Sequence, residues 1–190
     1  LRFLIQALPE VIAKEPDVVL VNIGFVTRSI QEELESLASS LKIEKHIRFV
    51  KPVPYEDMPA HISIAYICIG PLCPSLDTYG STPRKVLEYL ACAKPVIVCK
   101  GGVSSDLIQN AQNGLIVNFG DLKELEASIL KLLRNPTFAR RIGQKGRHHI
   151  VAFYDESVVT DKLNNEIQKL VFIDRYVSVK TKDKNAILLV

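Results

Sequence analysis

The sequence contains the short, mostly apolar run Val18-Val19-Leu20-Val21-Asn22-Ile23-Gly24, which is rich in β-branched residues and ends at a glycine. Apolar residues at nearly every position, rather than at every second one, are typical of a parallel strand covered by helices on both faces. We therefore expect a strand at residues 18–23 that is buried on both faces. Apolar residues at helical spacing on either side, over Leu1–Lys14 and Ser29–Leu41, indicate that helices and strands alternate.

The same alternation continues along the chain. The pattern predicts further strands at Ile47–Val50, Ser63–Ile69, Pro95–Cys99 and Gly114–Val117. It predicts helices at Tyr55–His61, Pro83–Cys92, Ser105–Asn110, Leu122–Arg134, Thr137–Ala152 and Glu156–Val171. Short strands separated by helices predict an α/β fold with an open, doubly wound parallel sheet.

The last segment differs from the rest. We place a domain at residues 1–171 and a tail at residues 172–190. The polar, turn-rich residues 180–185 lie between Tyr176–Val179 and Ala186–Val190, two apolar segments that could pair as a hairpin. The sequence assigns no role to this tail.

Composition excludes several classes of protein. With 190 residues, 47% hydrophobic and 24% charged, the chain is neither fibrous nor disordered, and its apolar runs are shorter than the roughly 20 residues of a membrane helix. Its net charge of +3 includes no basic block interleaved with aromatic residues, so we expect no nucleic-acid partner. The four cysteines lack C-x-x-C spacing, which indicates buried, reduced thiols in a cytosolic protein.

Because the chain starts at Leu1 inside a helical pattern, we expect it to be a fragment of a longer protein.

Ligands of an open parallel sheet bind outside the carboxyl ends of its strands. The loops expected there are Gly24–Arg28, Val50–Pro54, Gly70–Thr82 and Lys100–Ser105. In the third loop, Thr82 can cap the helix that Pro83 begins, which leaves free backbone amides for an anion. On that helix Glu88 falls on the polar side, so it points to the ligand or forms a surface ion pair with Arg84 or Lys85.

A longer stretch around this helix resembles a known family. Residues 81–98, Ser-Thr-Pro-Arg-Lys-Val-Leu-Glu-Tyr-Leu-Ala-Cys-Ala-Lys-Pro-Val-Ile-Val, resemble the donor-binding signature of the family-4 retaining glycosyltransferases. Ala93 departs from the pattern, which usually has glycine there. Residues 53–59, the pair Gly101-Gly102 with Asp106-Leu107-Ile108, and residues 113–117 also resemble segments of this family.

The resemblance implies the C-terminal, nucleotide-sugar-binding half of a two-domain GT-B enzyme, whose missing N-terminal domain binds a glycan, lipid or small-molecule acceptor. It implies that Glu88 accepts hydrogen bonds from the ribose hydroxyls and that Val53, within residues 50–53, lines the base pocket. Backbone amides of Gly80, Ser81 and Thr82 would bind the diphosphate or sugar, beside Lys85 of the same pattern. No metal and no cofactor are implied.

Two departures leave other functions open. The family commonly has a second glutamate where this chain has Gly80, and Asp77 is our substitute for it. The upstream Arg and Lys that neutralise the diphosphate in the family are missing, so the fragment alone should be inactive. The alternatives are a GT-B sugar-nucleotide epimerase and a non-catalytic nucleotide-binding or interaction module.

The helix expected at residues 137–152 has a basic face made by Arg140, Arg141, Lys145 and Arg147. Such a face is usually solvated, but it could also meet anionic lipid at the inner face of a membrane.

Overall fold

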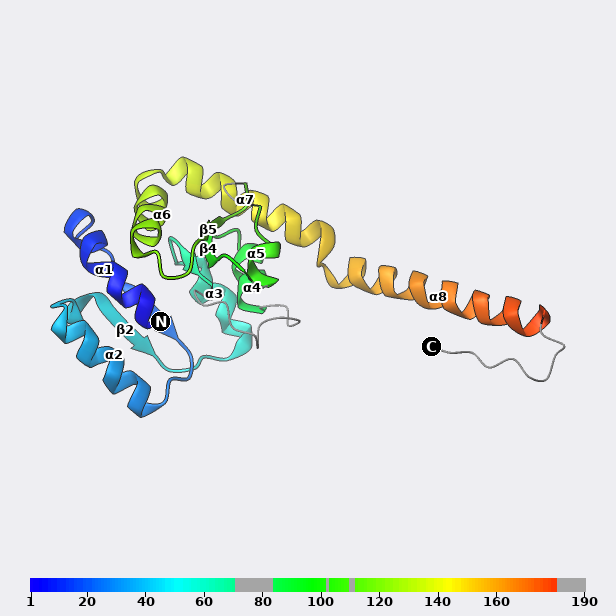
Figure 1. The fold of residues 1–190 in the computed structure, drawn as a ribbon, viewed down its shortest axis with the longest axis horizontal. Coiled ribbons are helices and arrows are strands. Elements are labelled where there is room, and N and C mark those ends of the chain that lie inside the picture. Colours follow the sequence, from blue (N-terminus) through cyan, green and yellow to red (C-terminus); the bar gives the residue numbers. More distant parts are fainter. Residues whose placement is uncertain (71–83, 102, 110–111, 181–190) are drawn as a thin grey trace. The chain divides into compact units, whose positions relative to one another are not determined.

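A computed structural model describes residues 1–70, 84–101, 103–109 and 112–180. The chain divides into two compact units, Leu1–Ile150 and Val151–Val190. The first unit therefore ends earlier than the boundary at residue 171 that the sequence suggests. Figure 1 shows the elements of both units, which are described separately below.

The strands of the first unit are all parallel, as expected. β1 (Leu20–Ile23) pairs with β2 (Ile47–Val50), with Leu20 opposite Ile47. β3 (Cys68–Ile69), β4 (Val96–Cys99) and β5 (Leu115–Val117) form a second set in the order β3-β4-β5. Helical segments separate consecutive strands, so the open α/β fold predicted from the sequence is confirmed.

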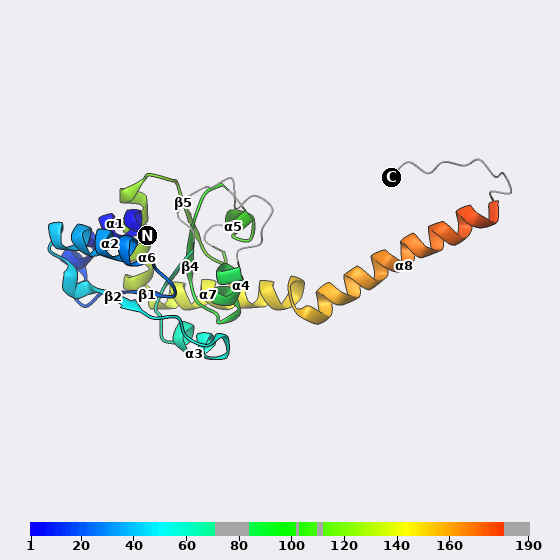
Figure 2. The same cartoon turned by 90° about the horizontal axis from the view of Figure 1, so that it is seen from below.

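Helices pack against the strands of the first unit. They are α1 (Arg2–Lys14), α2 (Arg28–Ser40), α3 (Met58–Ser63), α4 (Arg84–Ala91), α5 (Val103–Asp106), α6 (Leu122–Arg134) and α7 (Pro136–Phe153), with short 3-10 turns η1 at Glu44–His46 and η2 at Tyr55–Asp57. Figure 2 shows α1 and α6 on one side of β4 and β5, and α4 and α5 on the other.

The core follows from the alternation of side chains along β4. Ile97 packs with residues of α1 and α6, whereas Val96 and Val98 pack with residues of α3 and α4. All four residues of β4 are buried, as a strand covered on both faces requires. The apolar stripe of α1 contributes to two cores, because Leu4 packs with α6 while Ile5 packs with α2 and β2.

β1 is less buried than the sequence predicts. Val19 and Val21 are 47% and 50% exposed, although the run was expected to be covered on both faces. Among the described strands, β1 pairs only with β2, and β3 pairs only with β4. A parallel strand is buried by the neighbours on its two edges and the helices that cross them, and β1 has such a neighbour at one edge only.

Two other elements differ from the prediction. The strand expected at Ser63–Ile69 is limited to Cys68–Ile69, since α3 continues to Ser63 and Ile64 is 80% exposed. The helix expected at Ser105–Asn110 is α5 at Val103–Asp106. Side-chain bonds explain its early end: Asn113 Oδ1 accepts from the Gln109 amide at 2.6 Å, and Asn113 Nδ2 donates to the Leu107 carbonyl.

α7 packs across the amino ends of two strands. A Cβ on Gly143 would lie 2.2 Å from the carbonyl oxygen of Ala93, in the turn before β4. A Cβ on Gly146 would lie 2.6 Å from Cδ2 of Leu90 and 3.3 Å from the carbonyl oxygen of Asn113, just before β5. The two glycines therefore allow α7 to approach the backbone at the edge of the sheet opposite to the carboxyl ends.

The second unit contains α8, which runs from Glu156 to Lys180. Asp155 begins it, because its carboxylate accepts bonds from the amide and the hydroxyl of Ser157. The hairpin suggested for the tail is wrong, since Tyr176–Val179 is helical, and Ala186–Val190 lies outside the described residues. No helix in the described part of the chain combines the length and apolar character needed to cross a membrane.

Candidate functional site

A surface pocket of about 330 Å³ lies at the carboxyl ends of β1 and β2. Phe49, Val50, Lys51 and Pro52 line it from the end of β2. Its other wall follows β1 and continues into α2, through Gly24, Phe25, Val26 and Gln31. The lining thus combines two aromatic rings with exposed backbone, one amide side chain and one cation, groups that suit a planar, polar ring.

The segment after β2 connects this pocket to α4. The guanidinium of Arg84, the first residue of α4, lies 5.3 Å from the ring centroid of Tyr55 in η2. Cation–π contacts of this kind favour a fixed placement of the two segments. The carboxyl end of β2 and the amino end of α4 therefore lie on the same side of the unit.

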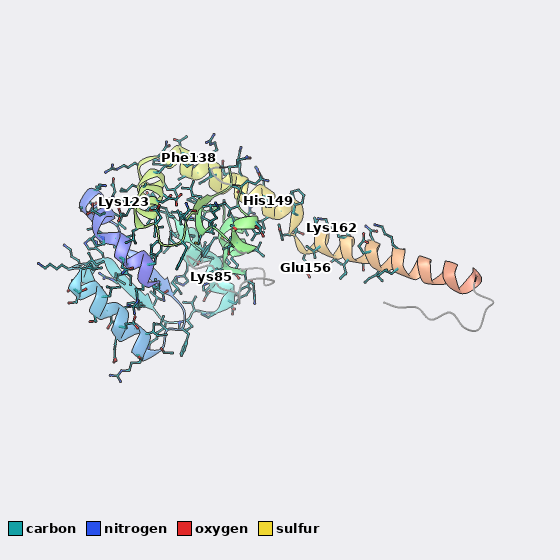
Figure 3. The ribbon with its side chains drawn as sticks, in the orientation of Figure 1. Lys85, Lys123, Phe138, His149, Glu156 and Lys162 are labelled. Carbon is teal, nitrogen blue, oxygen red and sulfur yellow. The ribbon has the colours of Figure 1, made fainter. Side chains whose placement is uncertain are left out.

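Glu88 and Lys85 lie on α4, as predicted. Val86 and Leu90 form the buried side of this helix, while Lys85 is exposed and Glu88 is half-buried (Figure 3 labels Lys85). Neither Arg84 nor Lys85 forms an ion pair with Glu88, and the Glu88 carboxylate accepts no hydrogen bond from any described residue. The surface ion pair considered as the alternative is therefore not formed, and the carboxylate can accept bonds from a ligand.

The remaining predicted residues are placed as follows. Val53 is half-buried and comes just after Pro52 of the pocket lining. Asp77, Gly80, Ser81 and Thr82 lie outside the described residues.

Gly70, which ends β3, shows how closely α4 approaches the sheet. A Cβ at this position would lie 2.9 Å from Cγ1 of Val98 and 3.0 Å from Cγ2 of Val86 in α4. Glycine therefore lets α4 and β4 pack together where the chain leaves the carboxyl end of β3.

The cysteines near this helix are not activated groups. Burial raises the pKa of the Cys68 thiol and of the neighbouring Tyr89 hydroxyl to about 12 in both cases, and it also raises the pKa of Cys92. These thiols are therefore protonated at neutral pH and are poor nucleophiles. The described residues contain no group of three His, Cys, Asp or Glu side chains able to hold a metal ion. Cys68 and Cys99 are buried, as predicted, whereas Cys92 is half-buried and Cys73 lies outside the described residues.

Sequence reasoning missed part of the pocket lining. It named the loops at the strand ends, but it did not single out Phe25, Gln31 or Phe49. Phe25 is 83% exposed, and an exposed phenylalanine directly after a strand that glycine ends is the signal that could have identified it. The contact of Arg84 with Tyr55 had no signal in the sequence, because it joins residues far apart in the chain.

With this fold, the chain falls among the α/β proteins with the GT-B fold. Residues 1–149 match the family of group 1 glycosyl transferases. The chain belongs to this family, which confirms the resemblance at that level.

Individual relatives agree with this assignment. The chain is 31% identical over 149 residues to the GDP-mannose-dependent alpha-(1-6)-phosphatidylinositol monomannoside mannosyltransferase of Mycolicibacterium smegmatis. The aligned region covers 76% of this chain and 38% of that protein. The chain thus spans about two fifths of the length of this relative.

Solved structures share the fold. HepE of Anabaena in complex with UDP superposes with a TM-score of 0.72 at 22% identity, over 89% of this chain and 44% of that one. The C-terminal domain of LpcC, a group 1 glycosyl transferase of Francisella tularensis, superposes with a TM-score of 0.70 at 22% identity, over 82% of this chain and 79% of that domain.

Proposed function

We propose that this chain is the donor-binding half of a retaining glycosyltransferase, which moves a hexosyl group from a nucleoside diphosphate to an acceptor hydroxyl. The observation that carries the proposal is the half-buried carboxylate of Glu88, which has no partner among the described residues, on a helix that Arg84 and Tyr55 connect to the pocket after β2. The base would occupy this pocket, with the ribose hydroxyls donating hydrogen bonds to Glu88. Similarity to a GDP-mannose-dependent enzyme and to a UDP-bound structure supports a nucleotide ligand of this kind.

The chemistry would consist of positioning and charge stabilisation. The departing diphosphate gains negative charge, which Lys85 and the backbone amides of Gly80, Ser81 and Thr82 would stabilise. Asp77 would replace the family's second glutamate at the transferred sugar. No side-chain nucleophile and no metal enter this scheme, and the acceptor is held by another part of the full-length protein.

The domain division supports the same proposal. We place a further parallel strand, contributed by upstream sequence, between β1 and β3, because both strands have a free edge among the described strands and Val21 is half exposed. The chain covers 38% of the mannosyltransferase but 79% of the LpcC C-terminal domain, as a C-terminal half would. The fragment alone would then bind donor without transferring it.

The acceptor in this proposal is a lipid-linked glycan. The mannosyltransferase relative is named for a phosphatidylinositol monomannoside, and a glycolipid of this class would require a cytoplasmic enzyme that works at the inner face of a membrane.

A nucleotide titration tests the donor site. We expect UDP or GDP to shift backbone amide resonances of the 190-residue chain at residues 24–26, 49–51 and 84–88, with a millimolar Kd, equivalent to about 4 kcal/mol. The affinity is weak because the upstream cations are absent. Shifts confined to α6 and α8, or none at all with excess nucleotide, would contradict the proposed site.

The substitution Glu88→Gln in the full-length protein tests the residue that carries the proposal. It keeps a hydrogen-bond acceptor but removes the charge, so we expect donor binding or turnover to weaken by roughly 1–3 kcal/mol with little change in Tm. Glu10→Gln, on an exposed position of α1, is the matched control. Glu124 is unsuitable as a control, because it accepts bonds from the amide and side chain of Asn118.

Equal kinetics for Glu88→Gln and Glu10→Gln would refute the assigned role. Product analysis separates the alternatives: an epimerase converts the sugar nucleotide without an acceptor, and a non-catalytic module binds it unchanged.

A further inference from the structure

The outer face of α7 carries several cations, and the stretch of chain around it contains no carboxylate. From residue 127 to residue 154 the chain has no Asp or Glu and six cations, Lys131, Arg134, Arg140, Arg141, Lys145 and Arg147. Elsewhere the two signs are mixed, since the whole chain has 24 basic and 21 acidic residues. This local asymmetry creates a positive potential over one part of the surface.

The packing of α7 determines which way these cations point. Its buried side chains are Ala139, Ile142 and Ile150, and its two glycines contact the backbone at the amino edge of the sheet. Arg140, Arg141, Gln144, Lys145, Arg147 and His148 are all exposed. At 3.6 residues per turn these exposed positions share roughly half of the helix circumference, over about 12 Å of its length.

The charges on this face are not neutralised within the unit. Ion pairs among the described residues involve Arg2, Arg28, Arg134 and Lys169, but none involves Arg140, Arg141 or Lys145. The face extends onto α6, where Lys131 Nζ lies 4.9 Å from the ring centroid of Phe138 while Arg141 stacks on the same ring at 5.3 Å. Figure 3 labels Phe138 and His149 towards the two ends of this part of α7.

We propose that this face, formed by Arg140, Arg141, Lys145 and Lys131, docks the protein on a bilayer that contains anionic lipid. A broad set of cations on α7 and the adjoining end of α6, with the ring of Phe138 half-buried beneath two of them, suits a planar anionic surface. None of the four residues of the face is aromatic, and Phe138 is half-buried, whereas proteins that bind single-stranded nucleic acid stack its bases on exposed rings.

The location of the face is compatible with donor binding. α7 crosses the amino ends of β4 and β5, whereas the pocket lies at the carboxyl ends of β1 and β2. Docking through α7 therefore leaves the donor site accessible. The inference rests on the proposed function only in its choice of a lipid partner, which the lipid-linked acceptor favours.

Vesicle sedimentation with the 190-residue chain tests the proposal. We expect binding to vesicles of phosphatidylcholine with 30% phosphatidylglycerol, weaker binding at higher salt, and no binding to pure phosphatidylcholine. The triple variant Arg140→Gln, Arg141→Gln, Lys145→Gln should bind about 100-fold more weakly, since each cation near such a surface contributes about fivefold. Arg147 is left unchanged because it donates a hydrogen bond to the carbonyl of Ala91.

The matched control removes the same charge elsewhere. Lys14→Gln, Lys42→Gln, Lys45→Gln changes three exposed lysines near α1, α2 and η1, and it should bind vesicles like the unaltered chain. Equal loss in both triple variants, no binding by the unaltered chain, or tighter binding to duplex DNA than to vesicles at the same ionic strength would overturn the proposal. Circular dichroism verifies that both variants are folded.

Nucleotide titration of the same variants separates this inference from the proposed function. Vesicle binding lost in the α7 variant with nucleotide shifts unchanged supports the docking face. Vesicle binding without any nucleotide shift would refute the donor site while leaving the docking face supported.

Discussion

Replacing Gly143 with alanine should destabilise the first unit, although alanine favours helices. Its Cβ would lie 2.2 Å from the carbonyl oxygen of Ala93, 2.9 Å from the carbonyl carbon of Ala93 and 3.1 Å from that of Lys94. All three are backbone atoms of the turn between α4 and β4, so no side-chain rotation relieves the contact. α7 would have to move away by about 0.8 Å to reach even the shortest separation that real Cβ atoms show, about 3.0 Å.

The expected magnitude follows from two opposing effects. Overpacking of this kind costs typically 1–3 kcal/mol, and a backbone clash belongs at or above the upper end of that range. The higher helix propensity of alanine stabilises the folded state by about 1 kcal/mol. We therefore expect Gly143→Ala to lower the free energy of unfolding by about 2 kcal/mol, which corresponds to a decrease in Tm of roughly 4–8 °C for a chain of this size.

Gly146→Ala is the matched comparison on the same helix. Its Cβ would approach Cδ2 of Leu90 at 2.6 Å, but a leucine methyl can rotate away, so we expect a net change near zero. Urea denaturation followed by circular dichroism measures both variants. A Gly143→Ala protein as stable as the unaltered chain, or no less stable than Gly146→Ala, would refute the close packing of α7 against this turn.

Four further substitutions test local features. Lys42 and Ala93 have positive φ angles of 58° and 55°, so Lys42→Gly should raise the free energy of unfolding by about 0.5–1 kcal/mol in thermal melts. Ala93→Gly should raise it by less, because a half-buried methyl group is lost. A lower Tm for Lys42→Gly would contradict the positive φ angle of this residue. Burial raises the pKa of Tyr89 to about 12, so the unfolded chain loses this proton at lower pH than the folded one and stability should fall as pH rises from about 10 to 12. Tyr89→Phe should flatten that part of a stability–pH profile, and an unchanged slope would exclude the effect. Asp121→Ala removes the carboxylate that accepts from the Glu124 amide at the start of α6 and should cost about 1 kcal/mol in urea denaturation, whereas no loss would mean that this cap is not formed in solution.

Local patterns in the sequence determined the fold class and the position of Glu88. The apolar spacing of α1 and of residues 122–134 defines helices because an amphipathic stripe depends only on nearby residues. In the same way, the spacing of Val86 and Leu90 left Glu88 on the polar side of α4. Residues 176–179 show the limit of such reasoning, since a short apolar run fits a strand or a helix equally well. This segment is helical, not the strand that its sequence suggested.

Only the tertiary structure decided what these elements bring together. The positive φ of Ala93 explains why the family's donor-binding signature usually has glycine at this position. No local pattern, however, reveals that Gly143 of α7 packs against the carbonyl group of Ala93. The pocket between Phe25 and Lys51 and the contact of Tyr55 with Arg84 join segments far apart along the chain. Such contacts depend on where the whole sheet places the ends of its strands, which periodicity along one segment cannot specify.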